Sequence, residues 1–173
     1  MNTKYLFSFL VVVGLFSCDL NSANDKKGRA KVEKINKQRC SFDLSADLHL
    51  EKIDSKFDEE GYFLIGSYKS SNILQLFVYD SQVDVEQNLD DQLKALNSPD
   101  VFKAKSIDSL NQFGIYNGKG IIMNGNYVGG VVKGTIKIFS YGKDEKGFLV
   151  IRQNVENTDS KNFDLIENSF LLK

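Results

Sequence analysis

The sequence contains no tryptophan, one proline, one histidine and two cysteines among its 173 residues. The single proline excludes proline-rich disorder and a collagen-like chain. With one histidine and so few cysteines, a zinc site of the usual His and Cys type is nearly excluded. A substantial core can still form, because 42% of the residues are hydrophobic and 13 of them are phenylalanine. The composition is that of an ordinary globular protein.

The apolar run at the N-terminus is too short to span a membrane. About a dozen residues, Tyr5 to Phe16, follow Lys4 and precede a polar stretch that begins at Asp19. A membrane-spanning helix needs roughly 20 apolar residues. One cation, a short apolar segment and then polar residues form the layout of a signal peptide. We therefore expect residues 1–17 to be a removable signal peptide and the protein to be exported.

The apolar run ends in Leu15-Phe16-Ser17-Cys18. This sequence resembles the lipobox of bacterial lipoproteins, in which a leucine, a variable residue and a small residue precede a cysteine that receives a diacylglycerol. The resemblance implies that Cys18 is the lipidated first residue of the mature chain, with membrane lipid as a partner. Two acyl chains hold a protein stably at a bilayer. We expect a bacterial membrane lipoprotein, facing the periplasm or on the cell surface, with the outer membrane favoured over the inner membrane.

Charge divides the mature chain into two parts. Residues 19–39 carry seven Lys and Arg against three Asp and Glu, whereas the chain from Cys40 onward carries 14 against 20. We interpret residues 18–39 as a lipidated, basic flexible tether, transiently helical near its end, and residues 40–173 as a single globular domain. An acidic domain without a basic stripe is a poor candidate for nucleic acid, so no nucleic-acid partner is expected. The acidic residues within the tether favour a solvated spacer over an anionic-lipid contact.

The second cysteine is predicted to be structural. If Cys18 carries lipid, Cys40 has no cysteine left to pair with inside the monomer, so stability must come from packing. Cys40 precedes a short alternating run, which is typical of a strand or core residue. His49, the single histidine, forms no recognisable catalytic motif with it.

Two helices are predicted from changes in hydrophobic periodicity. Between Asp84 and Asn97 the leucines recur at spacings of three and four, with Asp84 as the N-cap, and Pro99 follows the helix. A C-terminal helix beginning at Asp159 or Ser160 places three apolar side chains on one face, namely Phe163, Ile166 and Phe170.

The remaining apolar segments are typical of strands. Residues 61–68 and 73–79 form nearly continuous apolar runs, which predict a hairpin covered on both faces. Four further strands are expected after the first helix, in residues 101–110, 113–123, 128–141 and 147–154. At least one Asn-Gly pair, Asn117-Gly118 or Asn124-Gly125, is predicted to be a tight hairpin turn. The order of elements predicts an α+β domain, an antiparallel β-sheet flanked by helices and ending in a C-terminal helix.

The chain closes on NFDLIENSFLLK, which contains Ser169-Phe170, and GFLVIRQN comes before it. The closing segment is similar to the terminal helix of the Mog1/PsbP-like group, which includes bacterial DcrB-like lipoproteins, and GFLVIRQN is similar to that group's last sheet strand. The likeness covers roughly residues 42–173. It implies an α/β/α sandwich that serves as an accessory or partner-binding module, with no catalytic residues to carry over.

No motif in the sequence predicts catalysis, a cofactor or a metal. The Gly-Lys pairs at Gly118 and Gly142 lack the rest of a phosphate-binding loop. Three acidic groups, Asp90-Asp91, Asp58-Glu59-Glu60 and Asp80 with Asp84, lack the spacing of a calcium loop. We therefore expect no enzyme, but a non-enzymatic binding or accessory module acting on an envelope protein. The alternatives are a carrier or sensor of an apolar small ligand held between sheet and helix, and a hydrolase with an unrecognised carboxylate pair.

Overall fold

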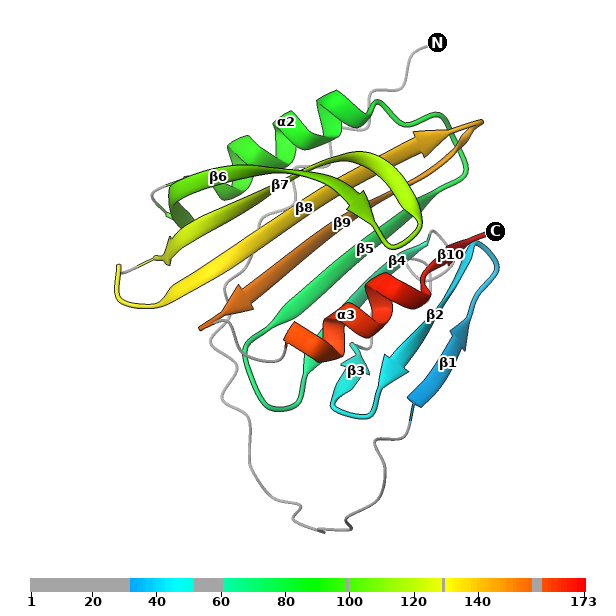
Figure 1. Ribbon diagram of the computed structural model, residues 1–173, viewed down its shortest axis with the longest axis horizontal. Helices are drawn as coiled ribbons and strands as arrows, with labels where there is room; N and C mark the ends of the chain where they lie inside the picture. The colour runs from blue at the N-terminus through cyan, green and yellow to red at the C-terminus, as the bar shows by residue number, and fades with distance from the viewer. Residues whose placement is uncertain (1–31, 52–60, 99, 129, 157–159) are drawn as a thin grey trace, which may run out of the picture.

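The computed structural model describes residues 32–51, 61–98, 100–128, 130–156 and 160–173. These residues form an α+β fold built on antiparallel strands, which confirms the predicted fold class (Figure 1). The larger sheet has seven strands, in the order β3 (Leu48–Leu50), β4 (Tyr62–Ser67), β5 (Ile73–Tyr79), β9 (Lys146–Val155), β8 (Lys133–Lys143), β7 (Tyr116–Tyr127) and β6 (Phe102–Phe113). The smaller sheet has three, in the order β1 (Val32–Asn36), β2 (Cys40–Ser45) and β10 (Leu171–Leu172).

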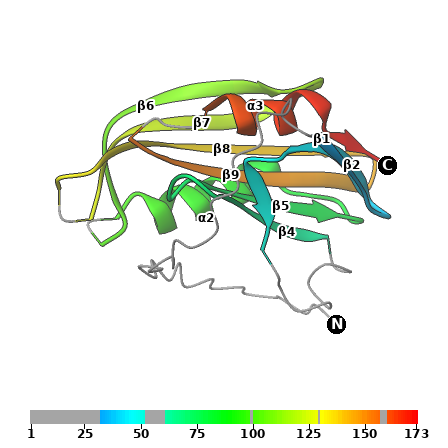
Figure 2. The same ribbon diagram turned by 90° about the horizontal axis from the view of Figure 1, so that it is seen from below.

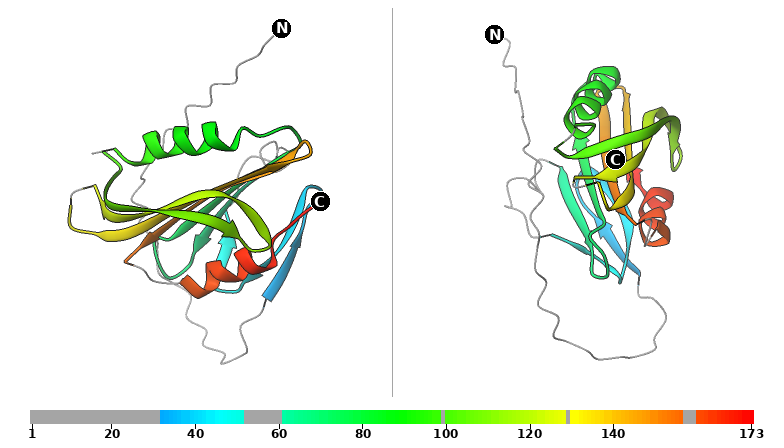
Figure 3. Two further views of the ribbon diagram at one scale, coloured as in Figure 1. Left: turned by 45° about the horizontal axis from the view of Figure 1, so that its top comes forward. Right: turned by 90° about the vertical axis from the view of Figure 1, so that its left-hand side faces the viewer.

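The described elements form three layers. Helix α2 (Val85–Leu96) packs on one face of the seven-stranded sheet, and helix α3 (Ser160–Ser169) lies with the small sheet on the other face. Figure 2 shows the two helices on opposite sides of the long strands, and the end-on view in Figure 3 shows the sheet between them. Because both faces of the central strands β8 and β9 are covered, successive side chains along these strands enter two different cores.

The core beneath α3 is rich in aromatic side chains, and we call it the aromatic core. Phe148, on the central strand β9, is fully buried there and its ring contacts those of Phe113, Phe139 and Phe170 at centroid distances between 4.7 and 5.8 Å. Burying one such side chain contributes about 1.5–3 kcal/mol. The buried members are Ile35, Cys40, Phe42, Leu44, Leu48, Phe63, Ile65, Leu74, Leu76, Val78, Phe113, Phe139, Phe148, Val150, Phe163, Ile166 and Phe170.

The core beneath α2 is mostly aliphatic, and we call it the aliphatic core. Its buried members are Leu96, Phe102, Met123, Ile136, Ile138, Leu149 and Ile151. Helix α2 contributes Leu96 together with the partly buried Leu89 and Leu93, the leucines whose spacing predicted the helix. The Asp84 carboxylate caps the helix by accepting a hydrogen bond from the Gln87 N–H at 3.0 Å, as predicted.

The prediction that an Asn-Gly pair forms a hairpin turn is wrong, because both pairs lie inside β7. A Cβ atom on Gly118 would lie 2.6 Å from both the Phe139 ring and the Ser140 carbonyl oxygen of neighbouring β8. A Cβ atom on Gly125 would overlap the Lys103 carbonyl of β6. These glycines are therefore required for close approach of neighbouring strands, and not for a turn.

The tight turns lie elsewhere. Gly114, with φ of 55°, and Ile115 connect β6 to β7, and Asp144 and Glu145 connect β8 to β9. Asp144 and Glu145 have φ of 51° and 62°. A two-residue hairpin with positive φ at both positions matches the right-handed twist of its strands, even where neither residue is glycine.

The N-terminal boundary of the domain also differs from the prediction. Residues 32–36, assigned to the flexible tether with transient helix, form strand β1 and pair with β2 from Val32↔Ser45 to Asn36↔Ser41. Only Ile35 of β1 is buried, so the strand is held by pairing and by one apolar contact. At the other end, β10 follows the C-terminal helix and adds a third strand to this small sheet.

Candidate functional site

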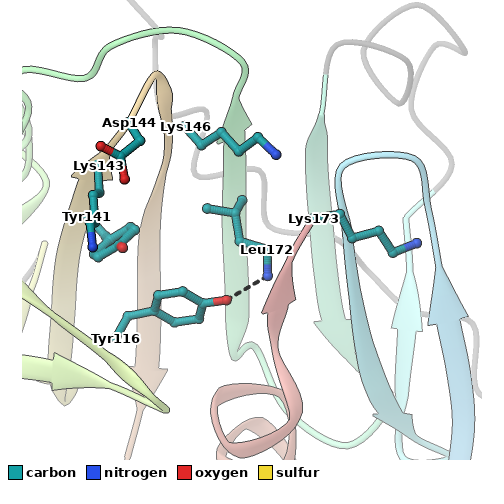
Figure 4. A pocket seen from close by; sticks show the side chains of 7 residues that line it. All are labelled: Tyr116, Tyr141, Lys143, Asp144, Lys146, Leu172 and Lys173. Carbon is teal, nitrogen blue, oxygen red and sulfur yellow. Dashed lines mark hydrogen bonds between the residues drawn. The ribbon is translucent and has the colours of Figure 1, made fainter.

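A pocket of about 370 Å³ lies where the two sheets meet at the C-terminal strand (Figure 4). Its residues come from β7, from the β8–β9 hairpin and from β10 with the residue after it. It is lined by Tyr116, Tyr141, Lys143, Asp144, Lys146, Leu172 and Lys173. The pocket therefore combines two aromatic rings with three cations and one anion, in a domain whose overall charge is negative.

Two tyrosines, packed on the aromatic core, form the aromatic part of the lining. The rings of Tyr116 and Tyr141 lie 4.9 Å apart in a T-shaped arrangement. Both also contact the fully buried Phe148, at 5.1 and 5.5 Å between centroids. Aromatic pairs at such distances are worth about 0.5–1.5 kcal/mol beyond the area that they bury, so the two rings are held in place by the core.

The hydroxyl of Tyr116 connects the two sheets. It accepts a hydrogen bond of 2.7 Å from the backbone N–H of Leu172 in β10, drawn as a dashed line in Figure 4. That N–H points away from β2, since the neighbouring Lys173 N–H is the one that donates to the Arg39 carbonyl of the β1–β2 turn. The Tyr116 hydroxyl thus supplies the acceptor that a neighbouring strand would otherwise provide for β10. Its own proton stays available to donate.

Two lysines lie directly opposite each other at the mouth of the pocket. Lys143 and Lys146 are register partners that flank the β8–β9 turn, and both are exposed. Side chains of such a pair start about 5 Å apart on the same face of the sheet, and like charges placed there repel. Neither ammonium group forms an ion pair with any described residue.

The third lysine of the lining is already engaged. The Lys173 ammonium donates hydrogen bonds of 2.5 Å to the Asn36 side-chain oxygen and to the Lys37 carbonyl oxygen. Figure 4 shows its side chain directed away from the pocket, toward the β1–β2 hairpin. Lys143 and Lys146 are therefore the lysines of the lining whose ammonium groups are available to contact a ligand.

The residues considered from sequence do not gather at this pocket. Cys18, the predicted lipidation site, lies outside the described residues. Cys40 is fully buried in β2, as predicted for a structural residue. His49 lies on β3, with its Nε2 atom 2.7 Å from a Glu51 carboxylate oxygen and its ring 4.3 Å from that of Tyr68.

Asp80, Asp84 and Asp91 each have a separate structural partner. Asp80 forms an ion pair with Arg39 at 2.7 Å, and Asp84 caps α2. Asp91 accepts a hydrogen bond from the Gln87 side chain at 2.8 Å. The group at residues 58–60 lies outside the described residues. In the part of the chain that the structure describes, no three His, Cys, Asp or Glu residues lie close enough together to hold a metal ion.

Sequence reasoning missed every residue of the pocket as a site residue. One signal was present: Tyr141 and Lys143 are two positions apart on β8, and Lys146 and Phe148 are two apart on β9, so all four share one face of the sheet. Their grouping with Tyr116 and Leu172 depends on strand pairing, which the pattern of single segments does not specify.

Comparisons with known proteins show similarity at the level of the fold. No family model matches the chain, and no curated protein matches it. A crystal structure from Bacteroides thetaiotaomicron VPI-5482 superposes with a TM-score of 0.50 at 11% identity, over 78% of this chain and 45% of that one. This chain therefore spans less than half of the length of the Bacteroides protein. LpqN, involved in cell envelope biogenesis of Mycobacterium tuberculosis, gives a TM-score of 0.49 at 10% identity, over 84% of this chain and 92% of LpqN.

Within the described residues, neither helix is long and apolar enough to cross a bilayer. The lipobox and the Mog1/PsbP-like resemblance stay predictions from the sequence.

Proposed function

We propose that the protein is a bacterial lipoprotein, anchored through acylated Cys18, whose domain is a non-enzymatic binding module of the cell envelope. The observation that carries the binding role is the pocket at Tyr116 and Tyr141, where rings fixed by the core lie beside Lys143 and Lys146, two cations without an ion pair to any residue that the structure describes. Concave sites with an aromatic lining and a few convergent polar groups are typical ligand or partner sites. The lining contains no serine, cysteine, threonine or histidine, the residues most often used as nucleophile or base, so binding is favoured over catalysis.

The position of the pocket suits an anchored protein. Strand β1 begins at Val32 and runs toward the turn at residues 37–39, whose Lys37 contacts Lys173 beside the pocket. The chain thus enters the domain at one end of β1, and the pocket lies at the other end, as Figure 1 shows for the C-terminus. Residues 19–31 could span at most about 45 Å when fully extended. From a lipid at Cys18 the pocket would be presented away from the point of attachment.

The carrier alternative placed its ligand between sheet and helix. The pocket described above lies instead at the end of the sheet, beside β10, and the residues beneath both helices are packed against each other. The binding module is therefore the function that we propose.

Anchoring is tested by fractionating cells that produce the native chain or the Cys18→Ala variant. The native protein should be found with the membranes and carry an acylated Cys18 at its N-terminus by intact mass. The variant should leave the membrane fraction. A native protein that is soluble and unacylated would refute the anchor.

Binding through the pocket is tested by photo-crosslinking in intact cells. A benzophenone amino acid replaces Tyr141, which lines the pocket, or Tyr68, which is 69% exposed on the loop after β4 and serves as the matched aromatic control. The Tyr141 position should capture one reproducible envelope component that the Tyr68 position does not capture. Equal capture at both positions, or none from Tyr141, would contradict the proposal.

A further inference from the structure

The pocket carries two like charges on one hairpin, and Figure 4 shows the side chains of Lys143 and Lys146 running apart on its two sides. Lys143 and Lys146 are directly opposed across the β8–β9 hairpin, and two like charges at such positions destabilise a sheet. Asp144 lies in the turn between them and lines the same pocket, but no ion pair joins it to either lysine. A bound anion would offset the like charge of the pair and attract both ammonium groups.

A third donor faces the same space. The Tyr116 hydroxyl accepts its hydrogen bond from the Leu172 N–H, which leaves its own proton to be donated into the pocket. An oxyanion accepts several hydrogen bonds at once, and bonds from charged donors are about twice as strong as neutral ones. The Tyr116 and Tyr141 rings supply apolar surface for whatever body carries the anionic group.

We infer that the pocket binds a ligand that carries an oxyanion, either carboxylate or phosphate, on a ring-sized body, with Lys143, Lys146 and the Tyr116 hydroxyl as donors and Tyr141 as apolar surface. The volume of about 370 Å³ suits a small ligand or the terminal group of a larger one. This inference rests on the proposed function and specifies the chemistry of the group that the module recognises.

The test uses the purified full chain and three probes that share a phenyl ring: phenyl phosphate, benzoate and benzamide, the neutral isostere of benzoate. Binding is followed by the amide NMR shifts of Gly142 and Leu172, which lie beside the pocket. At least one of the two anions should bind saturably in the millimolar range and shift both signals, whereas benzamide should not. Binding of phenyl phosphate alone would identify the oxyanion as phosphate, and binding of benzoate alone would identify it as carboxylate.

The matched variants are Lys143→Gln and Lys146→Gln, with Lys133→Gln at the opposite end of β8 as the control for loss of one charge. Each pocket variant should weaken anion binding about threefold to fivefold, because an exposed charge pair is worth up to about 1 kcal/mol. The control should stay within about twofold. Without ligand, each pocket variant should melt at or slightly above the temperature of the native chain, because the repulsion is removed.

Binding of benzamide as strong as that of the anions, or equal weakening by Lys133→Gln, would overturn the inference. Failure of all probes while Tyr141 still captures an envelope component in cells would overturn the oxyanion chemistry and leave the proposed function intact. Anion binding without capture in cells would support the site and contradict the proposed function.

Discussion

The aromatic core and the aliphatic core pack on opposite faces of the same strands, but they are assembled from different parts of the chain. The buried residues of the aliphatic core all lie between Leu96 and Ile151, whereas those of the aromatic core extend from Ile35 to Phe170. The aliphatic core is closed by one helix that follows directly after β5. The aromatic core is closed by a helix and a small sheet, and the pocket lies where that small sheet meets the large one.

This difference shows how a pocket can arise where two sheets meet. Over the aliphatic core, a single helix packs directly on the sheet through Leu89, Leu93 and Leu96. The small sheet must instead be joined to the large one across a gap between strands. Tyr116 bridges that gap with a side-chain hydroxyl in place of a backbone ladder, which leaves room for a pocket at the same point.

The largest effect should come from two neighbouring residues that serve the two cores. Phe148 is fully buried in the aromatic core, and Leu149 is 3% exposed in the aliphatic core. Phe148→Ala should lower the free energy of unfolding by about 4 kcal/mol and Leu149→Ala by about 3 kcal/mol, since more contacts are lost with the ring. Urea denaturation measures both. A larger loss for Leu149→Ala would show that the aliphatic core is the stronger one.

A second, smaller effect is a loss of stability at high pH that comes from Tyr79 beside the aliphatic core. Burial raises the pKa of Tyr79, which packs against the aliphatic core, from 10.0 to about 12. In the unfolded chain the phenol loses its proton near pH 10. The free energy of unfolding is therefore at its full value below pH 10 and falls, by an amount of the order of 2 kcal/mol, as the pH rises toward 12. Tyr79→Phe should remove part of this loss, as measured by urea denaturation across that range. An unchanged pH profile in Tyr79→Phe would refute the assignment.

The smallest effect should come from the hydroxyl that joins the sheets. Tyr116→Phe leaves the Leu172 N–H without its acceptor and should destabilise the protein by about 1 kcal/mol, with faster hydrogen exchange at Leu172. Tyr141→Phe is the matched control, because no hydrogen bond is found for its hydroxyl among the described residues, and it should change stability by less than about 0.5 kcal/mol. Equal effects of the two variants would mean that the Tyr116 hydroxyl does not connect the sheets.

The elements with a strong local signal were predicted well. Helix α2 follows from its leucine spacing and from Asp84 at the N-cap. The buried face of α3 follows from Phe163 and Ile166, with Phe170 directly after the helix in the same core. The β4–β5 hairpin follows from two apolar runs separated by polar residues. In each case the residues that determine the element lie close together in the sequence.

The misassigned elements depend on distant neighbours. Strand β1 exposes most of its side chains and exists because β2 pairs with it, so its own sequence carries little strand signal. Gly118 and Gly125 were interpreted as turn residues because Asn-Gly favours turns, whereas they are required by the approach of β8 and β6. The pocket unites Tyr116, the β8–β9 turn and Leu172, and only the pairing of both sheets brings these segments together.

The pairing of β2 with β10 also determines when the domain can complete its fold. Leu171 pairs with Ser41, which lies 130 residues earlier in the chain. During synthesis, β2 is made early, but its second neighbour β10 is made only after nearly all of the described domain. Bringing β2 and β10 together closes a long loop, which costs entropy before any contact compensates for it. We therefore expect the aromatic core to close last. The smaller sheet therefore stays incomplete until residues 171–172 have been synthesised.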